Sequence, residues 1–474
     1  MTPHGQSHLR GPGRSSTTGT SRTDADQRDR TAGGNFGEAD WRLREKVAAQ
    51  LIRARDRSVA LTDAVDDDDL TRQHSTLMSP LVWDLAHIGN QEELWLVRDV
   101  GGREPVRHDI DDLYDAFQHP RGDRPRLPLL SPAEARGYVR EVRDKVLDVL
   151  DRAPLEGRRL VADGFAFGMI VQHEQQHDET MLATHQLRRG APVLHAPPPP
   201  AAVRPPAAAE VLVPAGPFRM GTDIDPWALD NERPSHDVHV DAFVIDTAPV
   251  TNAGYAEFIA AGGYDDPRWW SEVGWAHRVK ADLTMPRFWL RDGDRWLRDR
   301  FGVVEPLPPD EPVVHVCFHE ARAYAAWTGK RLPTEPEWEK AARFDPETGR
   351  ARRFPWGDED PGPEHANLGQ RHLSPAPVGA YPAGVSPLGV HQLIGDVWEW
   401  LDSDFHGYPG FQAFPYREYS EVFFCGDYKM LRGGSFGTDP VASRATFRNW
   451  DHPIRRQIFA GFRCARDARP EEAT

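Results

Sequence analysis

The chain has 474 residues, of which 39% are hydrophobic, so it is long enough for about two to four domains with real cores. Its 57 Lys and Arg residues against 73 Asp and Glu residues give a net charge of −16. Such an acidic chain is unsuited to sequence-independent nucleic-acid binding, which depends on Lys and Arg contacts to phosphate. Three cysteines (Cys317, Cys425 and Cys464) are too few for a disulfide framework. Because neither a signal-peptide core nor a run of roughly 18 apolar residues occurs, we expect a cytoplasmic protein with no membrane partner.

The composition divides the chain into five segments. Residues 1–38 are rich in Gly, Ser, Thr, Arg and Asp and predict a disordered tail. Residues 39–190 carry apolar residues at helical spacing and predict a four-helix bundle. Residues 191–209, rich in Pro and Ala, predict a stiff extended linker. Residues 210–467 predict one α+β domain with much irregular structure, followed by a short tail at 468–474.

Capping signals predict where the bundle helices begin. Ser79 and Pro80 are typical of an N-cap followed by proline at the first helical position. Ser131 and Glu134 have the spacing of a capping box. The last helix of the bundle is predicted over 162–189.

Two histidines in the last predicted helix indicate a metal site. His173 and His177 are four residues apart, so their imidazoles lie on one helix face and can share a metal ion. His87, from an upstream helix with apolar neighbours, is the third ligand we favour, and His185 competes on spacing alone. Three neutral imidazoles with open positions suit zinc and ferrous iron about equally, so the ligand types leave the metal undecided.

The segment from His173 to His177 also has the spacing of the zinc metalloprotease signature, in which the intervening Glu174 would be the general base. One class of these enzymes extends the motif with Gly and His at positions that here hold Thr180 and Ala183. The protease interpretation is therefore disfavoured. A pair of core histidines without a metal is the remaining structural interpretation.

The C-terminal half contains seven short motifs, at 231–234, 250–252, 331–335, 355–357, 395–400, 431–435 and 461–463. On these motifs it is similar to the formylglycine-generating-enzyme-like domain, an α+β fold of the C-type-lectin kind. The N-terminal half, with its histidines, is similar to the DinB-like bundles, whose three histidines bind a metal. Over residues 41–467 the combination resembles the ergothioneine-biosynthesis sulfoxide synthases, also called hercynine oxygenases.

The resemblance implies an oxidoreductase that uses non-haem Fe(2+), with O2 as co-substrate. One substrate is hercynine, the betaine of histidine, and the other is a thiol, either γ-glutamylcysteine or free cysteine. The reaction joins sulfur to the imidazole ring and oxidises that sulfur, which gives γ-glutamyl-hercynylcysteine S-oxide in the γ-glutamylcysteine branch.

The resemblance also implies roles for particular residues. The implied iron ligands are His87, His173 and His177. The residues implied to contact hercynine are Gln176, Asn449 and Trp450. The residues implied to bind the thiol substrate are Arg121, Arg124, Asp451 and Arg455. Tyr416 is the implied catalytic proton donor, with Tyr419 in a supporting position.

Three rival functions fit parts of the sequence. Formylglycine formation requires a reactive cysteine pair, which the three cysteines do not recreate. A zinc-dependent thiol S-transferase would explain the histidines but would leave the second domain and Tyr416 without a role. A non-enzymatic binding module would leave the open metal positions unexplained.

Overall fold

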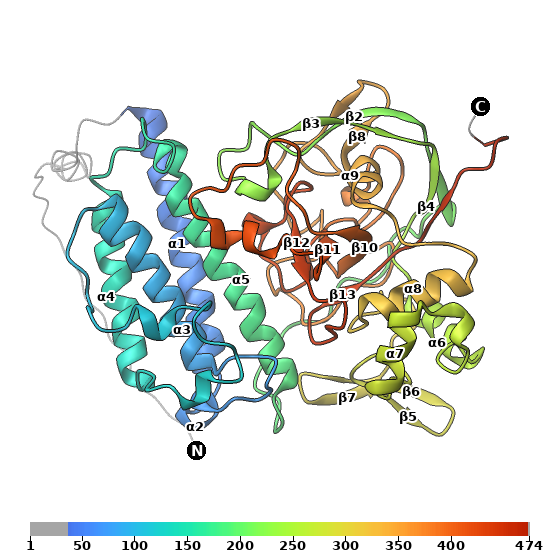
Figure 1. Cartoon of the computed structure of the whole chain (residues 1–474), viewed down its shortest axis with the longest axis horizontal. Coiled ribbons are helices and arrows are strands. Elements are labelled where there is room, and N and C mark those ends of the chain that lie inside the picture. The colour runs from blue at the N-terminus through green and yellow to red at the C-terminus, as the bar shows by residue number, and fades with distance from the viewer. Residues whose placement is uncertain (1–36, 473–474) are drawn as a thin grey trace, which may run out of the picture.

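The structure is a computed structural model that describes residues 37–472. The predicted tail at 1–38 therefore lies outside the described residues, apart from its last two positions. Figure 1 shows two bodies side by side, a helical bundle and a mixed body of helices and strands. This is the predicted fold class, and helix α5 (Phe165–Leu187) lies where the two bodies meet.

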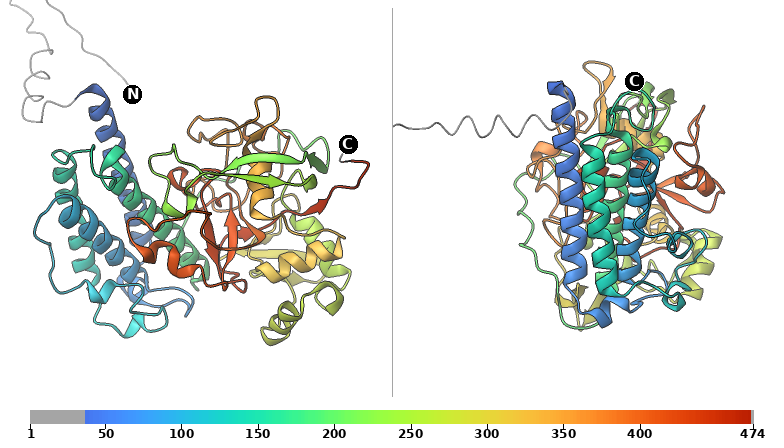
Figure 2. Two further views of the ribbon diagram at one scale, coloured as in Figure 1. Left: turned by 45° about the horizontal axis from the view of Figure 1, so that its top comes forward. Right: turned by 90° about the vertical axis from the view of Figure 1, so that its left-hand side faces the viewer.

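Four long helices form the bundle: α1 (Glu38–Asp63), α3 (Leu81–Glu92), α4 (Pro132–Leu150) and α5. They run side by side in the right-hand view of Figure 2, in front of the second body. The short helix α2 (Asp67–Thr71) connects α1 to α3. Because each helix buries apolar side chains against its neighbours, the bundle has a continuous core.

One predicted cap is confirmed and one is wrong. The hydroxyl of Ser131 accepts from the Glu134 backbone, and the Glu134 carboxylate accepts from the Ser131 backbone at 2.9 Å, so the capping box is present. Helix α3 begins one residue later than predicted, with Pro80 at the cap position. The Ser79 hydroxyl accepts a 2.6 Å hydrogen bond from Arg124 Nη1 instead of capping the helix.

Helix α5 is shorter than the predicted 162–189. Residues Ala162–Gly164 form a separate 3-10 turn, because Asp163 and Gly164 adopt positive φ angles of 54° and 71°. At the other end Arg188 is extended, so the helix stops at Leu187.

A buried ion cluster joins the bundle helices. Arg55 of α1 and Arg143 of α4 both contact Glu174 of α5, each at 2.7 Å. Both arginines also contact Glu92 of α3, at 2.6 and 2.5 Å. All four side chains are at least nine-tenths buried. Because removing one partner would leave a buried charge uncompensated, the four helices depend on this cluster for their arrangement.

The second body follows a segment, 191–209, that contains no helix or strand. Its central sheet has the order β12 (Asn449–Asp451), β11 (Lys429–Arg432), β10 (Trp398–Asp404), β13 (Ala460–Gly461). A second sheet has the order β1 (Glu210–Val213), β4 (Phe243–Asp246), β14 (Ala465–Asp467). Strands β10 and β11 pair antiparallel, and β11 pairs antiparallel with β12. Helices α8 and α9 lie beside these sheets (Figure 1).

The bounds of the elements of the second body are as follows. The central sheet contains β10 (Trp398–Asp404), β11 (Lys429–Arg432), β12 (Asn449–Asp451) and β13 (Ala460–Gly461). The second sheet contains β1 (Glu210–Val213), β4 (Phe243–Asp246) and β14 (Ala465–Asp467). Smaller sheets contain β2 (Gly216–Met220), β3 (His236–Val240), β5 (Trp289–Asp292), β6 (Arg295–Arg300), β7 (Val303–Pro306), β8 (Phe344–Asp345) and β9 (Arg350–Ala351). The helices are α6 (Asn252–Ala260), α7 (Glu272–Lys280), α8 (Phe318–Trp327) and α9 (Glu335–Arg343).

Glu179 of α5 attaches the bundle to the second body. Its carboxylate accepts hydrogen bonds from the indole of Trp398 at 2.8 Å and from the hydroxyls of Ser435 and Thr438 at 2.5 and 2.7 Å. Trp398 and Ser435 belong to two of the motifs singled out in the sequence. These motifs therefore hold the helix that carries two of the candidate metal ligands.

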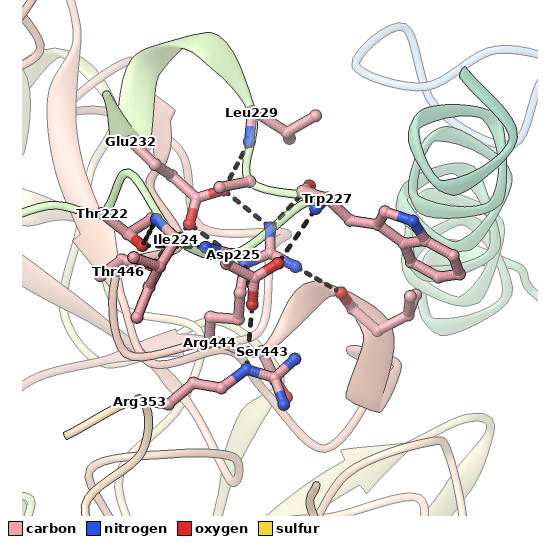
Figure 3. A network of polar contacts seen from close by, with 12 residues as sticks. Thr222, Ile224, Asp225, Trp227, Leu229, Glu232, Arg353, Ser443, Arg444 and Thr446 are labelled. Atoms are coloured by element: carbon pink, nitrogen blue, oxygen red, sulfur yellow. Dashed lines mark hydrogen bonds and ion pairs between the residues drawn. The ribbon is translucent and has the colours of Figure 1, made fainter. Parts of the chain in front are cut away.

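A second contact between the two bodies surrounds Arg444 and Trp227 (Figure 3). The Arg444 guanidinium bonds to Glu232 at 2.7 Å and to Gln172 of α5 at 2.8 Å. The Gln172 amide in turn donates to the carbonyl oxygen of Trp227 at 3.0 Å. The Trp227 indole packs on α5 at Gly168, where a Cβ atom would overlap its ring. Only glycine allows this close approach.

We expect Gly168→Ala to lower the free energy of unfolding by about 1–3 kcal/mol, the cost of overpacking a filled site. Chemical denaturation followed by tryptophan fluorescence measures this. Gly137 of α4 is the matched control, because a Cβ there meets no atom within 4 Å. Gly137→Ala should raise the free energy of unfolding by about 0.4–1 kcal/mol. Equal effects of the two substitutions would contradict the close approach at Trp227.

Candidate metal centre and substrate cavity

Three histidines from two helices form one compact group. His87 comes from α3, and His173 and His177 come from consecutive turns of α5. The centroid of the His87 ring lies 5.1 Å from that of His173 and 4.7 Å from that of His177. One nitrogen from each ring lies within 4.8 Å of the other two, which suits a shared metal ion. In the described part of the chain this is the one group of three or more His, Cys, Asp or Glu side chains with such spacing.

The hydrogen bonds of the rings suit metal binding. His87 Nδ1 is paired with the Tyr114 carbonyl oxygen at 2.7 Å, and His177 Nδ1 is paired with Asp84 Oδ1 at 3.0 Å. In each ring the other nitrogen is left for a metal. His173 Nδ1 is buried and has no hydrogen-bond partner within residues 37–472. In metal centres a histidine typically binds the metal through one ring nitrogen, while a hydrogen bond to the other nitrogen orients the ring.

Burial keeps two of these rings neutral. Desolvation, followed by the nearby His177 and His173 rings, holds the pKa of His87 well below its usual value. Desolvation and His177 likewise hold the pKa of His173 well below its usual value. Neutral imidazole is the form that binds metals, so both rings are ready to act as ligands near pH 7.

A stack of three planar groups supports His87. The Trp83 ring lies 4.6 Å from the His87 ring at an interplanar angle of 13°. The central carbon of the Arg124 guanidinium lies 3.5 Å from the centroid of the Trp83 ring. Such stacks hold a ring in one orientation.

Glu174, the candidate general base of a metalloprotease, is not part of this group. Its carboxylate bonds to Arg55 and Arg143 in the buried ion cluster. Burial alone would raise the pKa of Glu174, but the two arginines hold it below its usual value. His185, the competing ligand, pairs with the Leu61 carbonyl oxygen at 2.9 Å and lies outside the group of three histidines.

A cavity of about 350 Å³ lies between α5 and the sheet of the second body. None of the three histidines lines the cavity, but Gln176 and Thr180, each three residues after one of the α5 histidines, form part of its wall. The opposite wall comes from β11, β12 and the segment that follows β12. The structure brings six of the predicted substrate-binding residues to this cavity: Arg121, Gln176, Asn449, Trp450, Asp451 and Arg455.

Charged side chains of both signs line the cavity. Arg455 Nε lies 3.4 Å from Asp451 Oδ1. Burial raises the pKa of the Asp451 carboxyl, against the opposing effect of Arg455 and Arg121. Glu179 and Asp439 also line the cavity, but their carboxylates are already bonded to other side chains. The cavity therefore offers two guanidinium groups and the carboxylate of Asp451 to a charged ligand.

Apart from the three histidines, which also lie outside the cavity lining, three predicted site residues do not line this cavity. Arg124 is buried, and its three guanidinium nitrogens bond to the Ser79 hydroxyl and to the carbonyl oxygens of His119 and Ala116. Tyr419 lies next to the cavity wall, where its hydroxyl donates to Gln176 Oε1 at 3.5 Å. The ring of Tyr416 packs against Tyr419 at 6.1 Å, one step further from the cavity.

Two residues that orient the ligands were missed in the sequence. Asp84 and Trp83 precede His87 by three and four residues, so the helix places them on the same face as that ligand. Their spacing was a usable signal, because metal-bound histidines usually bond to a carboxylate or carbonyl through the other nitrogen.

Family models match both halves of the chain. The DinB superfamily model matches residues 50–181, and the Sulfatase-modifying factor enzyme 1-like domain matches residues 196–468. The hercynine oxygenase of Mycolicibacterium thermoresistibile is 55% identical over 437 residues, which cover 90% of this chain and 95% of that protein. The hercynine oxygenase of Mycobacterium tuberculosis is 54% identical over 428 residues, covering 89% of this chain and 99% of that protein.

The chain belongs to the hercynine oxygenase family. It is therefore an enzyme, and the resemblance stated from the sequence motifs is confirmed. The formylglycine-generating enzyme of Streptomyces coelicolor is 36% identical over 311 residues, but these cover only 58% of this chain and 96% of that protein. The likeness to hercynine oxygenases extends over both bodies, because it covers about 90% of this chain. No helix within residues 37–472 combines the length and apolar character that a membrane span requires.

We expect Asp84→Asn to weaken metal binding about 10- to 100-fold, because the substitution removes the carboxylate that orients His177. Titration of the metal-free protein with ferrous iron or cobalt(II) measures this. Asp111→Asn is the control, since Asp111 pairs with Arg98 and Asn90 in the same bundle. If both variants bound metal as tightly as the parent protein, Asp84 would not orient the site.

Proposed function

We propose that this enzyme uses Fe(2+) and O2 to join hercynine to γ-glutamylcysteine, giving γ-glutamyl-hercynylcysteine S-oxide. The observation that carries the proposal is the place of the three-histidine group beside a cavity of mixed charge, in a member of the hercynine oxygenase family. When bound by His87, His173 and His177, ferrous iron would supply open coordination positions and the redox chemistry that dioxygen requires.

The charges of the cavity favour γ-glutamylcysteine over free cysteine. The dipeptide carries two carboxylates and one ammonium group, whereas cysteine carries one of each. Arg121 and Arg455 can each bind a carboxylate, and Asp451 can bind the ammonium group. Arginine suits this task because its planar guanidinium bonds to both oxygens of a carboxylate. All three guanidinium nitrogens of Arg124 are bonded elsewhere, whereas Arg121 donates only Nη1, to the Leu77 carbonyl oxygen at 2.8 Å. We therefore assign the carboxylate-binding role in this cavity to Arg121 and Arg455.

The hercynine end of the site requires a surface for a trimethylammonium group. The Trp450 ring lines the cavity and is stacked on Phe405 at a centroid distance of 4.0 Å, which holds it in place. An aromatic face attracts a quaternary ammonium group by cation–π interaction. Gln176 and Asn449 lie on opposite walls, where their amides can hydrogen-bond the rest of the betaine.

Tyr416 is the proposed proton donor. Burial, followed by Asp230 and Glu418, raises the pKa of its phenol, so the hydroxyl keeps its proton throughout the physiological range. A protonated phenol can donate to a developing oxyanion during the reaction. Tyr419 lies between Tyr416 and Gln176 and supports the position of the Tyr416 ring.

The test of this function is a product assay. We expect the purified enzyme, loaded anaerobically with ferrous iron, to form the γ-glutamyl-hercynylcysteine sulfoxide when oxygen is admitted to hercynine, γ-glutamylcysteine and cysteine in competition. Mass spectrometry identifies the product. A cysteine adduct alone would keep the reaction but contradict the thiol assignment. Zinc in the native protein, with no sulfoxide from either thiol, would favour a thiol S-transferase.

Arg121→Ala should raise the KM for γ-glutamylcysteine about 10- to 100-fold, the range expected when a charged hydrogen-bond partner is lost. The KM for hercynine should change little, because Arg121 comes from the bundle loop and is not among the residues proposed to bind hercynine. Steady-state kinetics with each substrate varied in turn separates the two constants. Arg126→Ala is the control, since Arg126 lies in the same loop but is 73% exposed and pairs with Asp123. An unchanged KM in Arg121→Ala would remove Arg121 from the thiol site.

A further inference from the structure

An unusual helix carries an aromatic side chain to the boundary of the two bodies. After α3 the chain continues as the π-helix η2 (Glu93–Val100). Helices of this type are rare and are frequently found at functional sites. Trp95 lies in this segment and is half-buried.

The Trp95 ring stacks on the ring of Tyr416, the proposed proton donor. The ring centroids are 5.2 Å apart at an interplanar angle of 26°. This is the usual separation of a favourable offset stack. Tyr416 belongs to the second body, immediately before the 3-10 turn Arg417–Tyr419. The contact therefore joins η2, which follows the helix of His87, to the loop of the second body that contains Tyr416.

Aromatic rings lie on two sides of the Tyr416 ring, which also packs against the hydrophobic core. On its other side, Tyr419 meets the ring edge-on, at 6.1 Å and 82°. Within residues 37–472 the structure contains no hydrogen bond to the Tyr416 hydroxyl. The hydroxyl is thus left for a substrate or oxygen species, while its direction depends on the two rings that enclose it.

We propose that Trp95 is a positioning residue that sets the orientation of the Tyr416 phenol. This inference rests on the proposed function, in which Tyr416 donates a proton. Since a displacement of about 1 Å can cost 10²-fold in rate, a ring that loses its stacking partner should donate less efficiently. Substrate binding should be unaffected, because Trp95 does not line the cavity.

The kinetic test compares Trp95→Ala with Trp95→Phe in the iron-loaded enzyme. Trp95→Ala should lower kcat about 10- to 100-fold and leave the KM values for both substrates within about twofold. Trp95→Phe keeps an aromatic face and should restore most of kcat. The matched control is Phe117→Ala, because Phe117 also reaches from the bundle to the same loop but contacts Phe423 and not Tyr416. Its kcat should stay near that of the parent enzyme.

A double-mutant cycle tests whether Trp95 acts through Tyr416. Tyr416→Phe should itself lower kcat about 10²- to 10⁴-fold, the range for loss of a general acid. Adding Trp95→Ala to Tyr416→Phe should then cause little further loss. An equal loss in both backgrounds would overturn the inference, because it would show that Trp95 acts independently of the phenol.

A measurement without catalysis completes the test. In the metal-free protein, hydrogen exchange of the segment 411–424 should be faster in Trp95→Ala than in the parent, while the affinity for ferrous iron should be unchanged. Unchanged exchange together with parental kcat would overturn the inference and leave the proposed function standing. If Tyr416→Phe kept parental kcat, the assignment of the proton donor would fail first, and the role of Trp95 would fail with it.

Discussion

Helix α5 is held from two sides by buried carboxylates, and the geometry of the site depends on this double attachment. On the bundle side, Glu174 bonds to Arg55 and Arg143. On the other side, Glu179 accepts three hydrogen bonds from the second body. His173 directly precedes Glu174 in the sequence, and His177 lies between Glu174 and Glu179. A helix fixed in this way cannot rotate without breaking buried polar contacts, which are costly to leave unsatisfied.

This attachment also explains how two bodies make one site. The bundle supplies the three histidines and Arg121, while the second body supplies Asn449, Trp450, Asp451 and Arg455. The cavity lies along α5, so the same helix forms its floor and carries two of the ligands. The motifs around Trp398 and Ser435 contribute by binding Glu179. Through this bond both motifs contact the helix that carries two of the candidate metal ligands.

Much of this arrangement was predictable from local patterns, and the remainder depended on contacts distant in sequence. The spacing of His173 and His177 and the capping box at Ser131 are local signals, and the structure contains both features. The N-cap predicted at Ser79 was wrong because Arg124, 45 residues away, takes up its hydroxyl. The same contact, with the stack on Trp83, removes Arg124 from the cavity lining. A pattern of residues cannot show which of two nearby arginines is taken up by the protein itself.

The origin of the three histidines has a consequence for the evolution of the family. All three come from α3 and α5, and the partners of His87 and His177 also come from the bundle. Four of the six candidate substrate-binding residues that line the cavity (Asn449, Trp450, Asp451 and Arg455) come from β12 and the segment after it. Substitutions in that short segment would therefore alter the cavity lining without changing the three histidines. The three histidines and most of the opposite cavity wall are thus encoded in separate stretches of the gene, so either can change in sequence without the other.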